Sequence, residues 1–297
     1  MTGEIKAYAK LNLSLDVLEK KSDGYHSIRS VMQHADVFDT IRVTAVLSNE
    51  TSIRLSCKNP KFCPGVKWDE TNLAYKAAKL VCDQYNIKFA LDISVEKNIP
   101  VGAGLAGGSA DAAAVMRLLN DMLDLSFTNQ ELIELGTSLG ADIPFCLTGG
   151  TQLCEDIGQK LTLLSPFPCM DCIIVKPKAS LETKKIYELC DGYLKTAPHP
   201  DTEALVEAIN SGKTKRALKL FGNFMEEAAI SLCPEILEIK EILKNAGAAT
   251  SQMTGSGSAV FGLFESTAID KAYKYVSDAL RSVPYGKTCL IYRTKLL

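Results

Sequence analysis

The alternation of apolar and polar residues in the first third of the chain predicts β-strands. Residues 7–18 (AYAKLNLSLDVL) carry an apolar side chain at every second position, which is the period of a strand with one buried and one solvated face. Residues 40–47 (TIRVTAVL) and 52–57 (SIRLSC) repeat this alternation around the polar turn SNET, so we expect a hairpin. Residues 91–97 (LDISVEK) predict another strand.

The hydrophobic period lengthens to that of a helix in three later segments. Residues 71–85 follow a Thr or Asn cap and have helical apolar spacing, and residues 109–123 (SADAAAVMRLLNDML) show one apolar helical face. A third helix is predicted to begin after Thr128, because Glu131 completes a capping box. It should end before the sequence GADIP at 140–144, which is expected to be a loop at the helix exit.

The remainder of the chain predicts a second α+β layer structure. Residues 149–164 are expected to form a hairpin that turns at 156–158, and the proline-containing SPFPC at 165–169 is expected to separate two domains, 1–165 and 166–297. The elements predicted beyond it are a strand at 172–177, helices at 203–211, 214–228 and 235–246, a strand at 258–264, a helix at 268–281 and a strand at 288–294.

Composition and charge narrow the class of protein. With 297 residues, 46% hydrophobic and 23% charged, the chain has the composition of a globular protein large enough for two domains. The net charge of −2 argues against wide capture of nucleic acid or of an anionic membrane, so a small ligand is expected. The N-terminus does not resemble a targeting segment, and no run of about 18 apolar residues occurs. We therefore expect a cytoplasmic protein.

The ten cysteines are scattered along the chain, many of them inside apolar strings such as IPFCL. This distribution predicts buried, reduced thiols. Cys169 and Cys172 form a C-x-x-C motif, but no second pair follows at zinc spacing, so packing is favoured over metal or redox chemistry.

The glycine-rich stretch 101–113 (VGAGLAGGSADAA) is the strongest local sign of chemistry. It satisfies the dinucleotide pattern G-x-G-x-x-G, but polar residues and a proline precede it where an apolar strand is required. The later acidic residues also fail this pattern, because Asp121 and Asp124 end a helix instead of a strand. A Walker loop fails as well, since Gly108 stands where a lysine should precede Ser109.

A run of glycines at a helix N-terminus still suits a phosphate. The backbone amides can curl around an anion, and the helix end carries roughly half a positive charge. Glycine also permits positive φ angles and the close approach of ligand oxygens. A tight strand-to-helix turn, with Ser109 serving only as the helix cap, is the alternative that these residues alone leave open.

Four stretches together resemble one enzyme family. Residues 100–113 (PVGAGLAGGSADAA) resemble the second motif of the GHMP kinases, and residues 253–264 (MTGSGSAVFGLF) resemble the third. Residues 7–33, which contain AKLN and DGYH, and residues 139–161, which contain ADIP, are similar to the branch that phosphorylates a cytidine diphosphate sugar alcohol. These stretches occur in the family's order.

The resemblance implies an α+β fold of two domains with the active site in the cleft between them. The N-terminal domain would be of the ribosomal protein S5 domain 2 type, binding ATP and carrying the catalytic residues, and the C-terminal domain would be ferredoxin-like and bind substrate. The implied reaction is the transfer of phosphate from ATP, with Mg²⁺, to the 2-hydroxyl of cytidine diphosphate methylerythritol, in the non-mevalonate route to isoprenoids. A monomer or homodimer is expected.

The family motifs imply a role for individual residues. Asp142 would take the hydroxyl proton, and Lys10 would keep that carboxylate ionised and favour the alkoxide-like oxygen. Substrate contacts are implied for Asn12, for Tyr25 and His26 at the cytosine, for Thr183 and Tyr187, and for Gly255, Ser256 and Gly257. ATP contacts are implied for Asn72, Leu73, Lys97, Pro100, Gly102, Gly104, Leu105, Ala106, Gly107, Gly108 and Ser109. No carboxylate is assigned to Mg²⁺.

Small departures and two alternatives qualify this assignment. Ala103 and Ala106 replace glycines that are common in the family, and Ala110 replaces a serine. The methyl groups at 103 and 106 are tolerable if both residues keep negative φ angles. The alternatives are a GHMP kinase that acts on a different small alcohol and a catalytically silent nucleotide-binding sensor with the same fold.

Overall fold

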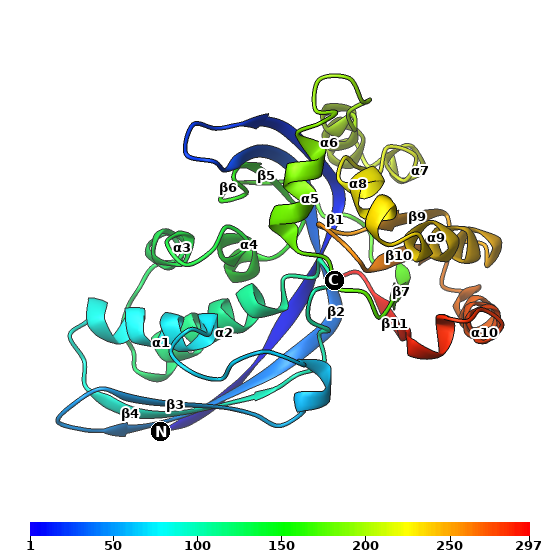
Figure 1. The fold of residues 1–297 in the computed structure, drawn as a ribbon. Helices are drawn as coiled ribbons and strands as arrows, with labels where there is room; N and C mark the ends of the chain where they lie inside the picture. The colour runs from blue at the N-terminus through cyan, green and yellow to red at the C-terminus, as the bar shows by residue number, and fades with distance from the viewer. The chain divides into compact units, whose positions relative to one another are not determined.

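Residues 1–60 and 62–297 are described by the computed structural model (Figure 1). They divide into two units. The first comprises residues 1–9, 37–101 and 106–149, and the second comprises residues 10–36, 102–105 and 150–297. The division at residues 165 and 166 that the sequence suggested stays a prediction.

The sheet of the first unit has the strand order β3-β4-β2-β1. Its strands are β1 (Thr2–Lys20), β2 (His26–Leu47), β3 (Ser52–Cys57) and β4 (Phe89–Glu96), of which β1 and β2 continue into the second unit. The expected hairpin between residues 40–47 and 52–57 is wrong, because β4 lies between them, antiparallel to β2 and parallel to β3. The reason is that Leu91, Ile93 and Val95 of β4 are buried, so β4 takes the central place.

Helices α1 (Leu73–Gln84) and α2 (Gly107–Met122) pack side by side, and α1 also contacts β3 (Figure 1). Both were predicted, and their buried faces are rich in alanine, which lets the two backbones approach. Helix α3 (Asn129–Thr137) has the predicted capping box of Thr128 and Glu131. The expected loop at 140–144 is too long, because helix α4 (Ile143–Thr148) begins inside it with Pro144 in its first turn, where proline is favoured.

In the second unit, β1 and β2 form a sheet with β5 (Gln152–Asp156), β6 (Lys160–Leu163) and β8 (Gly222–Asn223). The hairpin of β5 and β6 confirms the prediction at 149–164. The expected solvated face of residues 7–18 is wrong, since later segments of the unit cover it and supply polar partners such as Thr202. The polar side chains buried there are Lys10, Asn12, Ser14 and Asp16.

A second, antiparallel sheet in this unit has the order β11-β7-β10-β9. Its strands are β7 (Asp171–Lys176), β9 (Thr250–Met253), β10 (Val260–Phe264) and β11 (Leu290–Lys295). All of these were predicted except β9. Helices α9 (Glu235–Asn245) and α10 (Ile269–Arg281) pack against this sheet (Figure 1). Strand β10 is wholly apolar and buried, and β7 is apolar and buried over residues 172–175, so these two strands form the centre of the core.

Shorter helices complete the second unit: α5 (Thr183–Cys190), α6 (Thr202–Asn210), α7 (Thr214–Ala217) and α8 (Glu226–Leu232). Among the described residues there is one 3₁₀ turn in the first unit, η1 (Pro60–Phe62), and one in the second, η2 (Gly286–Thr288). The single helix expected at 214–228 is wrong. Gly222 and Asn223 pair there with β1, and the Asn223 side chain donates to the carbonyl of Gly255 over 2.8 Å. In the described part of the chain, every helix is too short or too polar to span a bilayer.

The capping box of α3 generates a stability prediction. Thr128→Ala removes the side chain that accepts from the Glu131 amide, and we expect the free energy of unfolding to fall by about 1 kcal/mol. Gln130→Ala, at an exposed position of the same helix, is the control and should change it by less than about 0.5 kcal/mol. Urea denaturation of both variants checks this, and equal effects would contradict it.

Candidate active site

Lys10 is a buried cation on β1. Its ammonium donates to Asn12 Oδ1 over 2.6 Å, and the residue is only 4% exposed. Across residues 1–60 and 62–297, no carboxylate lies within ion-pair distance of it. Burial of an ammonium without a counter-charge is costly. The Lys10 ammonium is therefore suited to bind an anionic group that is not part of this hydrogen-bond network.

Asn12 joins Lys10 to the turn at residues 254–257. Its Oδ1 also accepts from the backbone amide of Gly255 over 2.9 Å, and the backbone amide of Asn12 donates to Thr254 Oγ1 over 3.0 Å. Its Nδ2 donates to Ser30 Oγ over 2.8 Å. Because one Nδ2 hydrogen remains, the predicted substrate contact is chemically possible, and it stays a prediction.

The glycine loop, residues 102–105, lies against the same turn. Thr254 Oγ1 donates to the Gly104 carbonyl over 3.4 Å, and the Lys10 amide donates to the Leu105 carbonyl over 3.1 Å. Gly104 has a φ of +74°, and a Cβ built on it would lie 2.1 Å from the Thr254 carbonyl oxygen. Gly255, at φ +56°, is similarly close to Gly104. The close approach of these two motifs therefore requires glycine in both.

The first turn of α2 presents free amides to an anion. The cap residue is Ala106, which has no side-chain hydrogen bond to offer, so the alternative in which Ser109 caps the helix is wrong. Ala106 has a φ of +56°, so the condition that it keeps a negative φ is not met. The chain must turn sharply there to enter the helix, whereas Ala103 keeps a negative φ. Gly107 and Gly108 therefore stand in the first turn of α2, where backbone N–H groups have no partner within the helix and can bind an anion.

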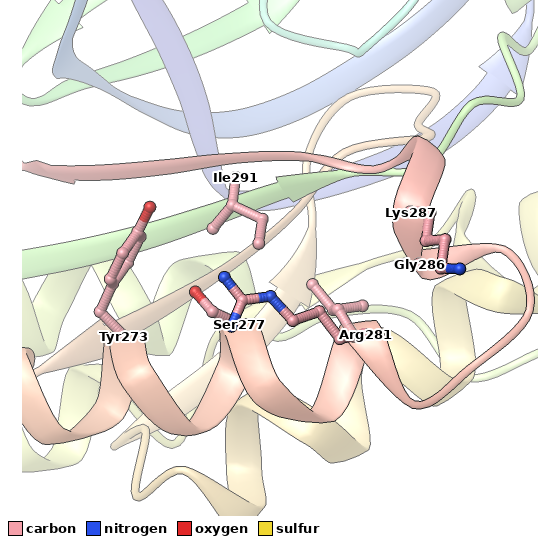
Figure 2. Close-up of a pocket in the computed structure, with 7 residues that line it drawn as sticks. Tyr273, Ser277, Arg281, Gly286, Lys287 and Ile291 are labelled. Atoms are coloured by element: carbon pink, nitrogen blue, oxygen red, sulfur yellow. The ribbon is translucent and has the colours of Figure 1, made fainter.

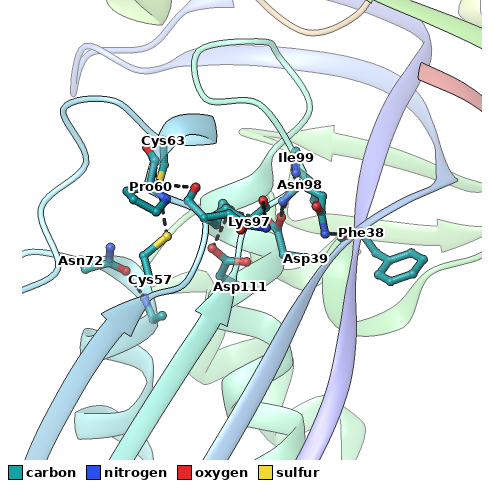
Figure 3. Close-up of polar contacts among 12 residues, drawn as sticks. Phe38, Asp39, Cys57, Pro60, Cys63, Asn72, Lys97, Asn98, Ile99 and Asp111 are labelled. Carbon is teal, nitrogen blue, oxygen red and sulfur yellow. Dashed lines mark hydrogen bonds and ion pairs between the residues drawn. The ribbon is translucent and has the colours of Figure 1, made fainter. Parts of the chain in front are cut away.

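Lys97 lies in a buried ion cluster of the first unit (Figure 3). Its Nζ is 2.7 Å from Asp111 Oδ2 and also bonds Asp39. Burial disfavours the charge, but the two carboxylates outweigh this and raise the pKa of Lys97. Burial raises the pKa of Asp111 well above its usual range. Asp39 also accepts from the amides of Asn98 and Ile99, so the cluster anchors the segment that leads into the glycine loop.

Of the other residues predicted to contact ATP, Asn72 and Leu73 lie in the first unit with Lys97, and Leu105 lies in the second. Asn72 caps α1 by accepting from the Ala74 amide over 3.0 Å, as predicted, and its Nδ2 donates to the Lys67 carbonyl. Leu105, in the second unit, has a buried side chain, which leaves its backbone as the group that can contact a ligand. The nucleotide contacts assigned to Asn72, Leu73 and Lys97 stay predictions.

Asp142 stands at the beginning of α4. Its side chain makes no capping hydrogen bond, and no described residue pairs with its carboxylate. The structure therefore does not support the simpler hypothesis that Asp142 only forms a hydrogen bond within its own turn. Its role as a base is compatible with a free, half-buried carboxylate, and it stays a prediction.

The predicted cytosine residues gather in the second unit. His26 Nε2 lies 2.7 Å from Asp191 Oδ1, and the ring stacks on Tyr187 with centroids 4.5 Å apart. Tyr25 is 62% exposed, which leaves its face open to a ligand. Thr183 and Ser256 share a hydrogen bond of 2.9 Å between their hydroxyls.

Sequence reasoning missed three acidic residues of these clusters: Asp39, Asp111 and Asp191. Asp111 lies inside the recognised motif SADAA, so its place in the motif was a usable signal. Asp39 stands in VFDTI and Asp191 in ELCDGY, which are not recognised motifs, and only the fold brings the two residues to Lys97 and His26.

Other features add no chemistry to this site. A hollow of about 360 Å³ beside α10 and β11 is lined by residues that include Tyr273, Arg281 and Ile291, none of them predicted at the site (Figure 2). Among the described residues, no group of three His, Cys, Asp or Glu side chains is arranged to hold a metal. Cys172 is buried in β7, whereas Cys169 is exposed.

Comparisons with known proteins identify the family of the chain. The family model described as the GHMP kinases N terminal domain matches residues 72–150, and that described as GHMP kinases C terminal matches residues 203–282. A crystal structure of homoserine kinase from Cytophaga hutchinsonii superimposes over 99% of this chain and 95% of its own, with a TM-score of 0.76 at 17% identity. The α+β fold and the glycine loop thus define the class as that of the GHMP kinases.

More similar relatives narrow the class. The 4-diphosphocytidyl-2-C-methyl-D-erythritol kinase of Caldicellulosiruptor saccharolyticus is 44% identical, over 94% of this chain and 90% of its own. That of Clostridium botulinum is 44% identical, over 88% of this chain and 91% of its own. A crystal structure of 4-(cytidine 5'-diphospho)-2C-methyl-D-erythritol kinase covers 99% of both chains with a TM-score of 0.77 at 29% identity. The chain belongs to the GHMP kinase family, in the branch that these relatives represent.

The ion cluster of Lys97 generates a second stability prediction. Lys97→Met leaves two buried carboxylates without a cation, and we expect the free energy of unfolding to fall by about 3 kcal/mol or more. The control is Lys79→Met, which removes an exposed ion pair with Asp83 and should have almost no effect. Equal denaturation midpoints for the two variants would show that the cluster contributes little.

The contact between the glycine loop and the 254–257 turn generates a third prediction. Gly104→Ala combines a positive φ with a backbone clash, and we expect it to lower the free energy of unfolding by about 2 kcal/mol or more. Gly108→Ala has nothing closer than 3.7 Å to its new methyl group and should leave stability unchanged or slightly higher. Thermal unfolding of both variants tests this, and a Gly104→Ala protein as stable as wild type contradicts it.

Proposed function

We propose that the protein transfers the γ-phosphate of ATP to the 2-hydroxyl of cytidine diphosphate methylerythritol. The relatives' names suggest this substrate. The observation that carries the proposal is the buried Lys10 ammonium, which has no carboxylate partner in its network and lies beside the glycine loop and the 254–257 turn. A cation in that position serves a reaction in which negative charge develops on a substrate oxygen.

The proposed mechanism divides the work among the motifs. The amides of the glycine loop and of the first turn of α2 bind the ATP phosphates, because they are unpaired donors at the positive end of a helix. Asp142 accepts the proton of the attacking hydroxyl. Lys10, oriented by Asn12, stabilises the negative charge of that oxygen as the bond to phosphorus forms.

Recognition of the two bases falls to different segments. Tyr25 offers an exposed aromatic face to cytosine, and His26 offers hydrogen bonds to the edge of the base. Tyr187, Thr183 and the 255–257 turn complete the substrate contacts. The nucleotide base of ATP lies against Asn72, Leu73 and Lys97, with Pro100 shaping the approach to the glycine loop.

Mg²⁺ enters as part of the nucleotide substrate. Among the described residues no cluster of acidic or histidine side chains is arranged to hold a metal by itself, so phosphate oxygens and water supply most of its ligands. The metal offsets the charge of ATP. We further propose a cytoplasmic protein that works as a monomer or homodimer.

The proposal predicts a specific loss of turnover. Asp142→Asn removes the proton acceptor without changing its size, and we expect kcat to fall by at least about 100-fold while ATP binding is retained. Purified protein is incubated with ATP, Mg²⁺ and cytidine diphosphate methylerythritol, and the product is detected by mass. Asp121→Asn, an exposed aspartate on α2, is the control and should keep full activity. Near-normal turnover in Asp142→Asn would reject the assignment, and turnover of only a different alcohol would reject the substrate.

A further inference from the structure

His26 is held by two residues of one helix segment. Tyr187 and Asp191 are four positions apart at the end of α5, so both reach the same neighbour. Tyr187 stacks on the imidazole at an interplanar angle of 16°, and Asp191 Oδ1 lies 2.7 Å from Nε2. The His26 side chain is only 5% exposed. Stacking on one side and a polar contact at one nitrogen leave the ring a single orientation.

The chemistry of Asp191 decides which nitrogen carries the hydrogen. Hydrogen bonds from His26 and Lys20 lower the pKa of Asp191, so its carboxyl is ionised at neutral pH and acts only as an acceptor. Its second oxygen accepts from Lys20 Nζ over 2.6 Å. The hydrogen of a neutral His26 ring must therefore sit on Nε2, and the lone pair must sit on Nδ1.

The Nδ1 atom is the group that remains for a ligand. Nδ1 has no hydrogen-bond partner among residues 1–60 and 62–297, and this atom is not fully buried. It is thus reachable from solvent although most of the ring is covered. A neutral ring in this tautomer offers an acceptor there.

We propose that Asp191 is a positioning residue that fixes the tautomer of His26, so that Nδ1 accepts a hydrogen bond and selects cytosine over uracil. Cytosine carries an amino donor where uracil carries a carbonyl oxygen. An acceptor on the protein can therefore receive a hydrogen bond from the amino group of cytosine. Opposite the carbonyl oxygen of uracil, two acceptors would face each other with no hydrogen between them, and this disfavours uracil. This inference rests on the proposed cytidine substrate.

The first experiment reads the tautomer without substrate. The chain has three histidines, so ¹⁵N-detected NMR of the imidazoles at pH 8 can be assigned with a His26→Gln variant. We expect wild-type His26 to carry hydrogen on Nε2 alone. In Asp191→Ala the ring should populate both tautomers, whereas Lys20→Met, which removes only the second partner of Asp191, should keep the wild-type signature. A wild-type ring with hydrogen on Nδ1 overturns the proposal.

The second experiment measures selection between bases. The kcat/KM for the cytidine diphosphate substrate is divided by that for its uridine analogue, at pH 8 and saturating ATP. We expect Asp191→Ala to lower this ratio about tenfold or more, mainly through a higher KM for the cytidine substrate, with the KM for ATP unchanged. Asp191→Asn keeps an acceptor oxygen and should retain most of the ratio, and Lys20→Met should retain all of it.

The possible results separate this inference from the proposed function. If wild-type protein transfers no phosphate to the cytidine substrate, the proposed function fails, and base selection fails with it. If wild type is active but Asp191→Ala, shown by thermal melting to be folded, keeps the wild-type ratio, only the role of Asp191 is rejected. Equal losses for ATP and for the cytidine substrate would mark Asp191 as a general structural residue and would also reject the proposal.

Discussion

The burial of the polar side of β1 is the constraint on which the second unit depends. A strand that carries Lys10, Asn12, Ser14 and Asp16 into the interior is stable only if each polar group finds a partner, because an unpaired one costs more than its hydrogen bond contributes. Some of those partners are distant in sequence: Thr202 lies 188 residues from Ser14, and Thr254 lies 242 residues from Asn12. The hydrogen bonds that the buried polar groups of β1 require therefore bring the glycine loop and the 254–257 turn to this strand.

Two lysines show how the same side chain serves different purposes. Lys97 is 3% exposed and Lys10 is 4% exposed, so burial does not distinguish them. Lys97 faces two carboxylates and is neutralised within the protein, which suits an anchor for the segment that precedes the glycine loop. Lys10 has only an amide oxygen, so its charge remains available to a substrate. The partners, and not the depth of burial, indicate which lysine can act in the reaction.

The same contrast applies to the aspartates. Asp39 and Asp191 each use both oxygens for contacts within the chain, and so they hold other groups in place. Asp142 begins a helix without capping it, which leaves its carboxylate uncommitted. The mechanism that we propose uses both kinds, because a base accepts a proton efficiently only where the groups around it are held in place.

The sequence alone determined the features that local chemistry controls. The helix of residues 109–123, the capping box at Thr128, the hairpin at 149–164 and the strands β7, β10 and β11 follow from period and turn residues, and the family motifs indicated the GHMP class. Only the tertiary structure decided that β4 separates β2 from β3, that the polar side of β1 is buried, and that Asp39 and Asp191 reach Lys97 and His26. The reason is that strand order and the partners of buried charges depend on contacts between distant segments, which leave no periodic trace in the chain.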